Sequence, residues 1–492
     1  MLYLVKLSPE ITIRSRVVRR KYTRQLSKNL NKILREHDSL MQIKREWDVI
    51  EVDSSLLKLN EIAKFDSRLR CIPGVGRIHK VRKYPIPPME DMFHLARDAY
   101  DKILKGKTFA VRCRRMGEHS FTSVEVERYV GERIRAECET AGVKLKSPDV
   151  TVLLEIRNDF FYVVTEKFFG LGGFPLGCQD SVISMISGGF DSSVSSYLSI
   201  KRGLLAHYCF FNLGGKEHEL AVKEIALFLW LKFHTSHRVK FVSVSFEPVL
   251  EEILRQVESP YVPVILKRMM LRAGDKVARK LGINTIVTGE SIGQVSSQTL
   301  ANLSIIDRAS TSLILRPLCF HDKQEIINTA REIGTEGFSK RVPEYCGVTS
   351  KNPTTKAKLS KVEREESRLN MALLEEAVTK ANYQSITALP DVFGEESTHI
   401  EVVKLPQGRT TVIDIRHPNE EQRSPLRLGK EIRIIKIPFY DLRMYSEKLE
   451  QDGRYLLYCA QGMMSRLQAV YLTNKGYRNI AILDLGNLEN KI

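Results

Sequence analysis

Long apolar runs and paired cysteines are both missing from this 492-residue sequence. No stretch of about 18 apolar residues lacks charge, so we expect no membrane-spanning helix, and the first residues carry no apolar run with a secretory cleavage site. The eight cysteines form no Cys-x-x-Cys pair, which disfavours a disulfide framework and a zinc ribbon. His207, His234 and His237 lack the spacing of a metal ligand set. These absences favour a reducing, cytoplasmic setting.

Acidic residues are scarce where the chain is most basic. The sequence has 76 Lys and Arg against 59 Asp and Glu, a formal net charge of +17, which predicts a polyanionic partner such as nucleic acid. Residues 14–35 include no acidic residue, and apolar residues at helical spacing lie between the basic ones. We therefore expect a helix with one packed face and an otherwise basic surface. An ordinary solvated helix face accounts for this segment equally well.

A second basic region spans residues 105–146 and is centred on a strand-like segment at 108–113. Arg112, Arg114 and Arg115 lie in and directly after that segment. Further strands are expected at 150–156 and 160–165. The glycines of residues 170–177 predict a linker after them.

Apolar runs alternate with helical segments from about residue 180 onward. Such alternation favours parallel strands joined by helices, in a sheet covered on both faces. The expected strands are 182–186, 206–211, 240–246, 285–288 and 313–318. Proline and glycine near residues 390–394 indicate a second linker, and the last ninety or so residues form another small α/β pattern. The length itself suggests three to four domains at about 150 residues each.

Residues 187–192, Ser-Gly-Gly-Phe-Asp-Ser, follow one of these strands directly and precede a helical pattern. Glycines let backbone N–H groups approach a phosphate, and a helix N-terminus adds positive charge there. Asp191 could hold Mg²⁺ beside the phosphate. The loop lacks the spacing and the lysine of a Walker A motif. The alternative is an ordinary glycine-rich turn capped by serine.

Cys459 ends an apolar strand at 455–458 and precedes a short loop and a helical pattern. Backbone amides and a helix dipole at such a position stabilise a thiolate, and a persulfide anion equally. On this pattern alone, a small buried apolar cysteine is the alternative interpretation.

These motifs resemble those of tRNA uridine 4-sulfurtransferases, also called thiamine-biosynthesis sulfurtransferases. Residues 187–192 resemble the PP-loop of ATP pyrophosphatases, and residues 288–299 resemble the family's downstream motif. Residues 105–165 resemble a THUMP domain, while residues 414–416, 458–465 and 476–480 resemble a rhodanese domain. The resemblance implies an α/β multidomain protein with a ferredoxin-like domain at 1–60 and a THUMP RNA-binding domain at 61–167. A parallel-sheet PP-loop ATP pyrophosphatase domain at 176–392 and a rhodanese-like α/β domain at 404–492 would follow.

The resemblance also implies an activity, in which ATP with Mg²⁺ adenylates O4 of uridine-8 in tRNA and persulfide sulfur replaces the activated oxygen to give 4-thiouridine. The implied ATP contacts are Met185, Ile186, Ser187, Gly188, Gly189, Asp191, Ser192, Lys267, Gly289 and Gln298, with Asp191 as the metal ligand. Catalysis would rest on Asp191, Lys323 in the activation step, and Cys459 as the sulfur carrier. Cys346 would attack the persulfide and form a disulfide with Cys459 that a reductant resets.

The implied partners are tRNA, a cysteine desulfurase as sulfur donor and a sulfur-carrier protein of the thiazole pathway, with a homodimer as the assembly common in the family and no membrane. The expected tRNA contacts are Arg14, Arg16, Arg19, Arg20, Lys21, Arg24, Arg112, Arg114 and Arg115. Residues 460–465 lack a basic side chain, which favours a protein donor over free thiosulfate.

Two other functions stay open at this point. The chain could serve chiefly as a sulfur relay for thiamine thiazole formation, which needs Cys459 but no tRNA. It could also be a tRNA-binding module without turnover, although the intact Gly188, Gly189, Asp191 and Ser192 argue against this.

Overall fold

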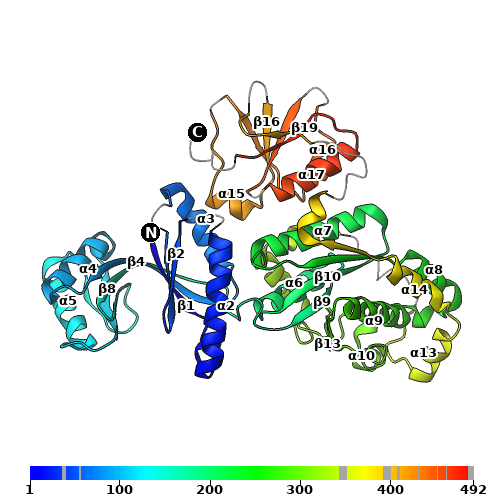
Figure 1. The fold of residues 1–492 in the computed structure, drawn as a ribbon, viewed down its shortest axis with the longest axis horizontal. Helices are drawn as coiled ribbons and strands as arrows, with labels where there is room; N and C mark the ends of the chain where they lie inside the picture. Colours follow the sequence, from blue (N-terminus) through cyan, green and yellow to red (C-terminus); the bar gives the residue numbers. More distant parts are fainter. Residues whose placement is uncertain are drawn as a thin grey trace. The chain divides into compact units, whose positions relative to one another are not determined.

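The computed structural model describes residues 1–35, 40–54, 57–342, 352–391, 400–406, 410–429, 431–450, 453–460 and 462–485. The chain folds into two compact units, Met1–Pro175 and Leu176–Ile492 (Figure 1). Cys346 lies outside the described residues. No helix in the described part of the chain combines the length and apolar character needed to cross a bilayer.

One eight-stranded sheet runs through the N-terminal unit, in the order β2-β3-β1-β4-β8-β7-β5-β6. Its middle is antiparallel: β1 pairs with β3 and β4, and β4 pairs with β8. The strands are β1 (Leu2–Leu7), β2 (Gln42–Arg45), β3 (Val49–Asp53), β4 (Val75–Pro85), β5 (Thr108–Met116), β6 (Gly142–Val143), β7 (Val150–Arg157) and β8 (Phe160–Phe169). The helices are α1 (Pro9–Thr12), α2 (Arg16–Leu34), α3 (Leu59–Arg70), α4 (Met89–Leu104) and α5 (Ser123–Glu137).

Helix α2 is the basic helix that the sequence predicts within residues 14–35. Its apolar residues Leu26, Leu30 and Ile33 are buried in the core beneath it, in contact with the sheet. Its basic residues are excluded from that core by charge, and most of them, including Arg16, Arg20 and Arg24, lie on the outer surface of the first half of the helix.

A six-stranded sheet forms the centre of the C-terminal unit, in the order β13-β12-β9-β10-β11-β14. All pairs are parallel except β11 with the edge strand β14. The strands are β9 (Ser181–Met185), β10 (Leu205–Asn212), β11 (Lys240–Ser245), β12 (Thr285–Val287), β13 (Leu313–Leu315) and β14 (Asn382–Ser385). Strand β13 ends before the predicted residue 318, because Pro317 cannot donate a ladder hydrogen bond.

Helices cover this sheet on both faces, and α7 is buried along most of its length. The helices are α6 (Phe190–Lys201), α7 (Gly215–Phe233), α8 (Glu247–Gln256), α9 (Val262–Lys280), α10 (Leu300–Asp307), α11 (Lys323–Ile333), α12 (Glu336–Ser339), α13 (Leu359–Glu366) and α14 (Met371–Thr379). Short 3₁₀ turns are η1 (Ser259–Tyr261), η2 (Ser296–Gln298) and η4 (Ile386–Asp391).

A five-stranded parallel sheet, β15-β19-β18-β16-β17, completes the C-terminal unit. Its strands are β15 (Val402–Val403), β16 (Thr410–Asp414), β17 (Arg433–Lys436), β18 (Arg454–Tyr458) and β19 (Ile480–Leu483). Its helices are α15 (Pro418–Arg423), α16 (Leu442–Ser446) and α17 (Met463–Asn474). The protein is thus a multidomain α/β protein that combines a mixed N-terminal sheet with two largely parallel sheets.

Candidate active site

The strand order reverses at β9, because β10 and β11 lie on one side of it while β12 and β13 lie on the other. The loops that leave the carboxyl ends of β9 and β12 therefore diverge at a topological switch point, where open parallel sheets bind ligands. Residues 187–189 follow β9 and lead into α6, and residues 288–299 follow β12.

Hydrogen bonds within the loop after β9 hold it in shape. Ser192 Oγ accepts from the Ser187 N–H at 3.2 Å and donates to the Gly189 carbonyl at 3.1 Å. Gly188 has φ +90°, and a Cβ there would lie 2.8 Å from Val342. A Cβ on Gly289 would lie 2.7 Å from the carbonyl carbon of Asp191, so the two loops meet through bare backbone. Both glycines are required by this close approach.

A cavity of about 370 Å³ opens between these loops. The predicted ATP contacts line it, except Gly188, which packs against Val342 and Val222. One side is apolar and was missed by sequence reasoning, because such residues in strands and helices have the pattern of ordinary core residues. These apolar residues include Leu213, Pro263, Leu266, Met270 and Ile306. The cavity thus pairs an apolar slot with a polar loop at a helix N-terminus, the combination that a nucleotide needs.

A buried carboxylate holds the predicted ATP contact Lys267 in place. Glu290 Oε1 lies 2.7 Å from Lys267 Nζ, and Glu290 Oε2 lies 2.8 Å from Arg316 Nε. Thr288 Oγ1 donates to the same carboxylate at 3.0 Å. Burial alone would raise the pKa of Glu290, but Lys267 and Arg316 outweigh it and lower that pKa to about 2. Glu290 stays ionised, fixes Lys267 at the cavity wall and pairs with Arg316, which does not itself line the cavity.

Asp191 and Lys323 are brought together although 132 positions separate them. Lys323 Nζ lies 3.1 and 3.4 Å from the two carboxylate oxygens of Asp191, and Gln294 Nε2 donates to Oδ2 at 3.1 Å. Lys323 opens α11, whose start is fixed by a capping box between Asp322 and Glu325. Gln294 was missed, although it lies within the predicted 288–299 segment.

Asp191 and Glu290 both line the cavity, but Glu290 is already paired with Lys267 and Arg316, so Asp191 is the carboxylate that would take a cation. The described residues contain no group of three or more His, Cys, Asp or Glu side chains able to hold a metal ion. A single carboxylate suits Mg²⁺ that arrives with phosphate oxygens as its other ligands.

The predicted sulfur carrier, Cys459, lies at the carboxyl end of β18 and is 9% exposed. Its Sγ accepts from the backbone N–H of Ser465, in the first turn of α17, at 3.3 Å, and the Ser465 hydroxyl lies at the same distance. Asp414 and Arg416 form a buried ion pair in the same sheet, with Nη2 and Oδ2 2.6 Å apart. The amide and the helix N-terminus favour a negative charge on the sulfur.

Helix α17 packs antiparallel to α7, so the Cys459 loop and the cavity lie toward opposite ends of α7. Gln468 Nε2 donates to Glu224 at 2.7 Å, and Lys475 Nζ lies 2.8 Å from Glu217. Residue numbers therefore rise along α17 where they fall along α7, so the two helices run in opposite directions. At the start of α7, His218 Nε2 donates to the Ser187 carbonyl at 3.2 Å. Cys459 precedes α17 and therefore lies beside the far half of α7.

The predicted tRNA contacts of the N-terminal unit fall into two groups. Those of α2 lie on the outer surface of its first half, where the guanidinium groups of Arg16 and Arg19 lie within 6 Å of the Trp47 ring centre. Those of β5 engage the protein itself: Arg112 donates to the Leu145 carbonyl, Arg114 pairs with Asp48, and Arg115 donates to the Gly117 carbonyl. Arg14 lies with its guanidinium 5.6 Å from the Phe174 ring.

The fold and these sites define a multidomain, ATP-using α/β enzyme with a PP-loop domain. The family model described as Thiamine biosynthesis protein (ThiI) matches residues 177–371, and a THUMP domain model matches residues 88–166. The tRNA sulfurtransferase of Shewanella halifaxensis is 47% identical over 483 residues, covering 98% of this chain and 99% of the relative. The chain belongs to the tRNA sulfurtransferase family.

Solved structures agree with this assignment. The structure of a 4-thiouridine synthetase–RNA complex with bound ATP matches with a TM-score of 0.68 and 26% identity, covering 78% of this chain and 99% of that chain. The Pyrococcus horikoshii protein PH1313 matches with a TM-score of 0.52 and 19% identity, covering 68% of this chain and 100% of that chain, which supports the fold alone.

Proposed function

We propose that this tRNA sulfurtransferase uses ATP to activate O4 of uridine-8 in tRNA and replaces that oxygen with persulfide sulfur, giving 4-thiouridine. The observation that carries the proposal is the cavity at the switch point, where the glycine-rich loop, Asp191 and Lys323 converge. The family relationship and the matching synthetase–RNA complex with bound ATP support the choice of substrates.

The loop and the start of α6 would bind the phosphates of ATP. Backbone N–H groups at the helix N-terminus face the β- and γ-phosphates, while the apolar slot takes the adenine ring. Asp191 would hold Mg²⁺, and the cation would offset the charge of the phosphates. Lys267, held by Glu290, and Lys323 stabilise charge that develops as uridine O4 attacks the α-phosphate and pyrophosphate leaves.

Cys459 would carry the sulfur. A cysteine desulfurase transfers a sulfur atom to its thiolate, and the Ser465 amide and the α17 N-terminus stabilise the resulting persulfide anion. The terminal sulfur attacks C4 of the activated uridine and AMP leaves. Cys346 then attacks the Cys459 sulfur, which releases the thiolated base, forms a disulfide and calls for a thiol reductant. The same persulfide could supply the thiazole pathway through a sulfur-carrier protein, in the cytoplasm.

We infer from the antiparallel packing of α17 on α7 that the sheet carrying Cys459 moves before sulfur reaches the cavity. A photo-crosslinking phenylalanine at position 217 would covalently fix α17 in the packed position. The crosslinked fraction should bind ATP normally but fail to transfer sulfur from a preformed Cys459 persulfide. Wild-type transfer in that fraction would rule out the movement.

Paired variants in one reaction set test the whole proposal. Unmodified tRNA, Mg·ATP, cysteine, a cysteine desulfurase and a reductant are combined with wild type, Cys459→Ala or Asp191→Ala. Wild type should give the near-ultraviolet absorbance of 4-thiouridine. Cys459→Ala should give no product and at most one pyrophosphate per tRNA, whereas Asp191→Ala should release none yet still accept sulfur on Cys459.

The other outcomes are equally informative. Equal product from wild type and Cys459→Ala would remove Cys459 from the pathway. No product from wild type, with sulfur still found on Cys459, would redirect the assignment to a sulfur relay for the thiazole pathway.

A further inference from the structure

A groove of about 600 Å³ lies between the first half of α2 and the β2–β3 hairpin in the N-terminal unit. Its volume falls within the roughly 300–1,000 Å³ of sites that bind small ligands. Five of its lining residues are basic and one is acidic. They are Arg19, Arg20, Lys21, Arg24 and Arg45, with Glu46. The charge of this groove therefore suits a phosphate-bearing ligand.

Trp47 lies at the hairpin turn and gives the groove an aromatic wall. The guanidinium carbon of Arg19 lies 4.6 Å from the centre of its ring, and that of Arg16 lies at 5.5 Å. Arg19 also donates from Nη2 to the Trp47 carbonyl at 3.2 Å. The side chain remains 46% exposed, whereas Trp230 in α7 is 7% exposed and donates to a backbone carbonyl. Trp47 is thus held rigidly yet keeps much of its apolar surface uncovered.

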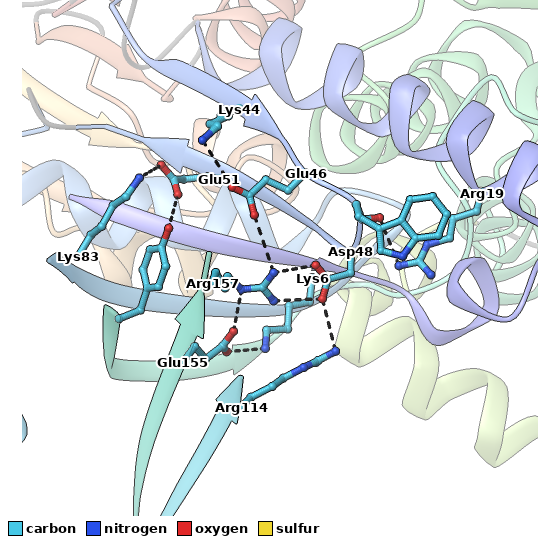
Figure 2. A network of polar contacts seen from close by, with 12 residues as sticks. Lys6, Arg19, Lys44, Glu46, Asp48, Glu51, Lys83, Arg114, Glu155 and Arg157 are labelled. Carbon is cyan, nitrogen blue, oxygen red and sulfur yellow. Dashed lines mark hydrogen bonds and ion pairs between the residues drawn. The ribbon is translucent and has the colours of Figure 1, made fainter. Parts of the chain in front are cut away.

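The residue next to Trp47 is anchored in a buried ion network (Figure 2). Arg157 grips both carboxylate oxygens of Asp48, at 2.7 and 3.1 Å, and Arg114 pairs with the same carboxylate at 3.4 Å. Burial opposes ionisation of Asp48, but Arg157 outweighs it and lowers the pKa of Asp48. Arg157 itself is bound to Glu155 at 3.1 Å. The hairpin turn is therefore fixed to β7, which keeps the Trp47 ring in position.

We propose that this groove, the Trp47 groove, binds one unstacked nucleotide of tRNA, whose base stacks against the indole while its phosphates contact the α2 arginines. Bases stack on aromatic side chains without regard to sequence, and arginine planes extend such a stack. The groove would thus fix the position of the tRNA on the N-terminal unit. This inference rests on the proposed tRNA substrate. It adds a residue that stacks on a base to a set of expected tRNA contacts that otherwise consists of Arg and Lys side chains.

Binding of unmodified tRNA to the full chain tests the Trp47 groove, with Trp47→Ala, Trp47→Phe and Arg19→Gln as variants. Trp47→Ala should weaken binding between ~5-fold and ~100-fold, while Trp47→Phe should retain much of the affinity. The loss should be equal at every salt concentration, because no charge is removed. Arg19→Gln should instead flatten the salt slope by about one phosphate. Ile103→Ala, at a similarly exposed apolar position on α4, is the matched control and should bind normally.

Fluorescence gives a second readout that does not depend on stability. The difference between wild type and Trp47→Phe isolates the emission of Trp47, which should be quenched by tRNA and protected from acrylamide. Unchanged emission together with wild-type affinity of Trp47→Ala would overturn the inference, as would protection by the desulfurase but not by tRNA. If wild type binds no tRNA at all, the proposed function fails rather than this groove alone.

Discussion

Two loops of the C-terminal unit both connect a parallel strand to a helix, but one borders a cavity and the other surrounds a cysteine sulfur. Residues 187–189 lie between the parallel strand β9 and α6, just as Cys459, Ala460 and Gly462 lie between the parallel strand β18 and α17. The first loop borders a cavity of about 370 Å³. The second directs a backbone N–H from its helix at the chain's own sulfur, Cys459 Sγ, at 3.3 Å.

Under the proposed function, one strand–loop–helix plan would serve an external anion in the first loop and the chain's own sulfur in the second. A helix N-terminus favours negative charge in both cases. In the first loop Gly289 lets the neighbouring loop approach the backbone of Asp191 without a side chain, and the cavity beside it stays open. In the second loop the Cys459 thiol itself accepts from the backbone N–H of Ser465. Substitutions in each loop measure how far its function depends on the group that lies within it.

The largest effect is expected from adding one methyl group at Gly289. A Cβ there would lie 2.7 and 2.8 Å from backbone atoms of Asp191 and Ser192, so the phosphate loop must shift. Gly289→Ala should slow pyrophosphate release about 100-fold, since a misplacement of about 1 Å can cost a reaction rate that much, and it should weaken ATP binding as well. The rate of pyrophosphate release and equilibrium binding of ATP measure the two effects.

The matched substitution in the other loop is Gly462→Ala. Gly462 has φ +70°, and no described atom lies within 4 Å of its Cβ position, so only the backbone strain of about 1–2 kcal/mol applies. Persulfide formation on Cys459 should fall modestly and ATP binding should not change. Equal ATP affinities of Gly289→Ala and wild type would show that the first loop does not depend on this close approach.

The loop itself was predictable from sequence, whereas much of the cavity around it was not. Glycine, serine and aspartate in residues 187–192 encode a turn and a helix start locally, and the strand predicted at 182–186 lies within one residue of β9. Arg316 and the apolar slot come from segments that only the strand order brings together. Trp47 was missed because half-exposure of a tryptophan has no sequence pattern. The predicted Cys346–Cys459 disulfide stays a prediction.

An intermediate effect is expected from Glu290→Gln, which tests whether the cavity wall depends on a charge. The change leaves Lys267 and Arg316 without their shared carboxylate, and we expect a destabilisation of about 2–3 kcal/mol, below the 3–5 kcal/mol of fully buried pairs. Arg316 keeps its contact with Asp307. Urea unfolding of both proteins at pH 7 gives the difference, and ATP binding should weaken with it.

The free energy of unfolding should depend on pH in a direction set by the lowered pKa of Glu290. The pKa of Glu290 is about 2 in the folded protein against 4.5 ordinarily, so its ionised form stabilises the fold fully above about pH 4.5. That contribution is lost as the pH falls through about 2. The stability gap between wild type and Glu290→Gln should therefore narrow between pH 5 and pH 2. A gap that stays constant over this range would assign the effect to packing instead of charge.

The smallest effect is expected from Ser465→Ala, which removes a hydroxyl that contacts the Cys459 sulfur. The hydroxyl lies 3.3 Å from Sγ but also donates to the Gly462 carbonyl at 2.9 Å, so it is only partly available to a thiolate. The backbone N–H of residue 465 remains. Loss of one such hydrogen bond, about 1 kcal/mol, should slow alkylation of Cys459 about 5-fold, with Cys459→Ala as the blank. Ser192→Ala is the counterpart in the first loop and should cost more, because it leaves the Ser187 N–H without its acceptor. If both serine variants lose equally little, the backbone alone defines the two loops, and the difference between them lies entirely in whether a cysteine fills the space.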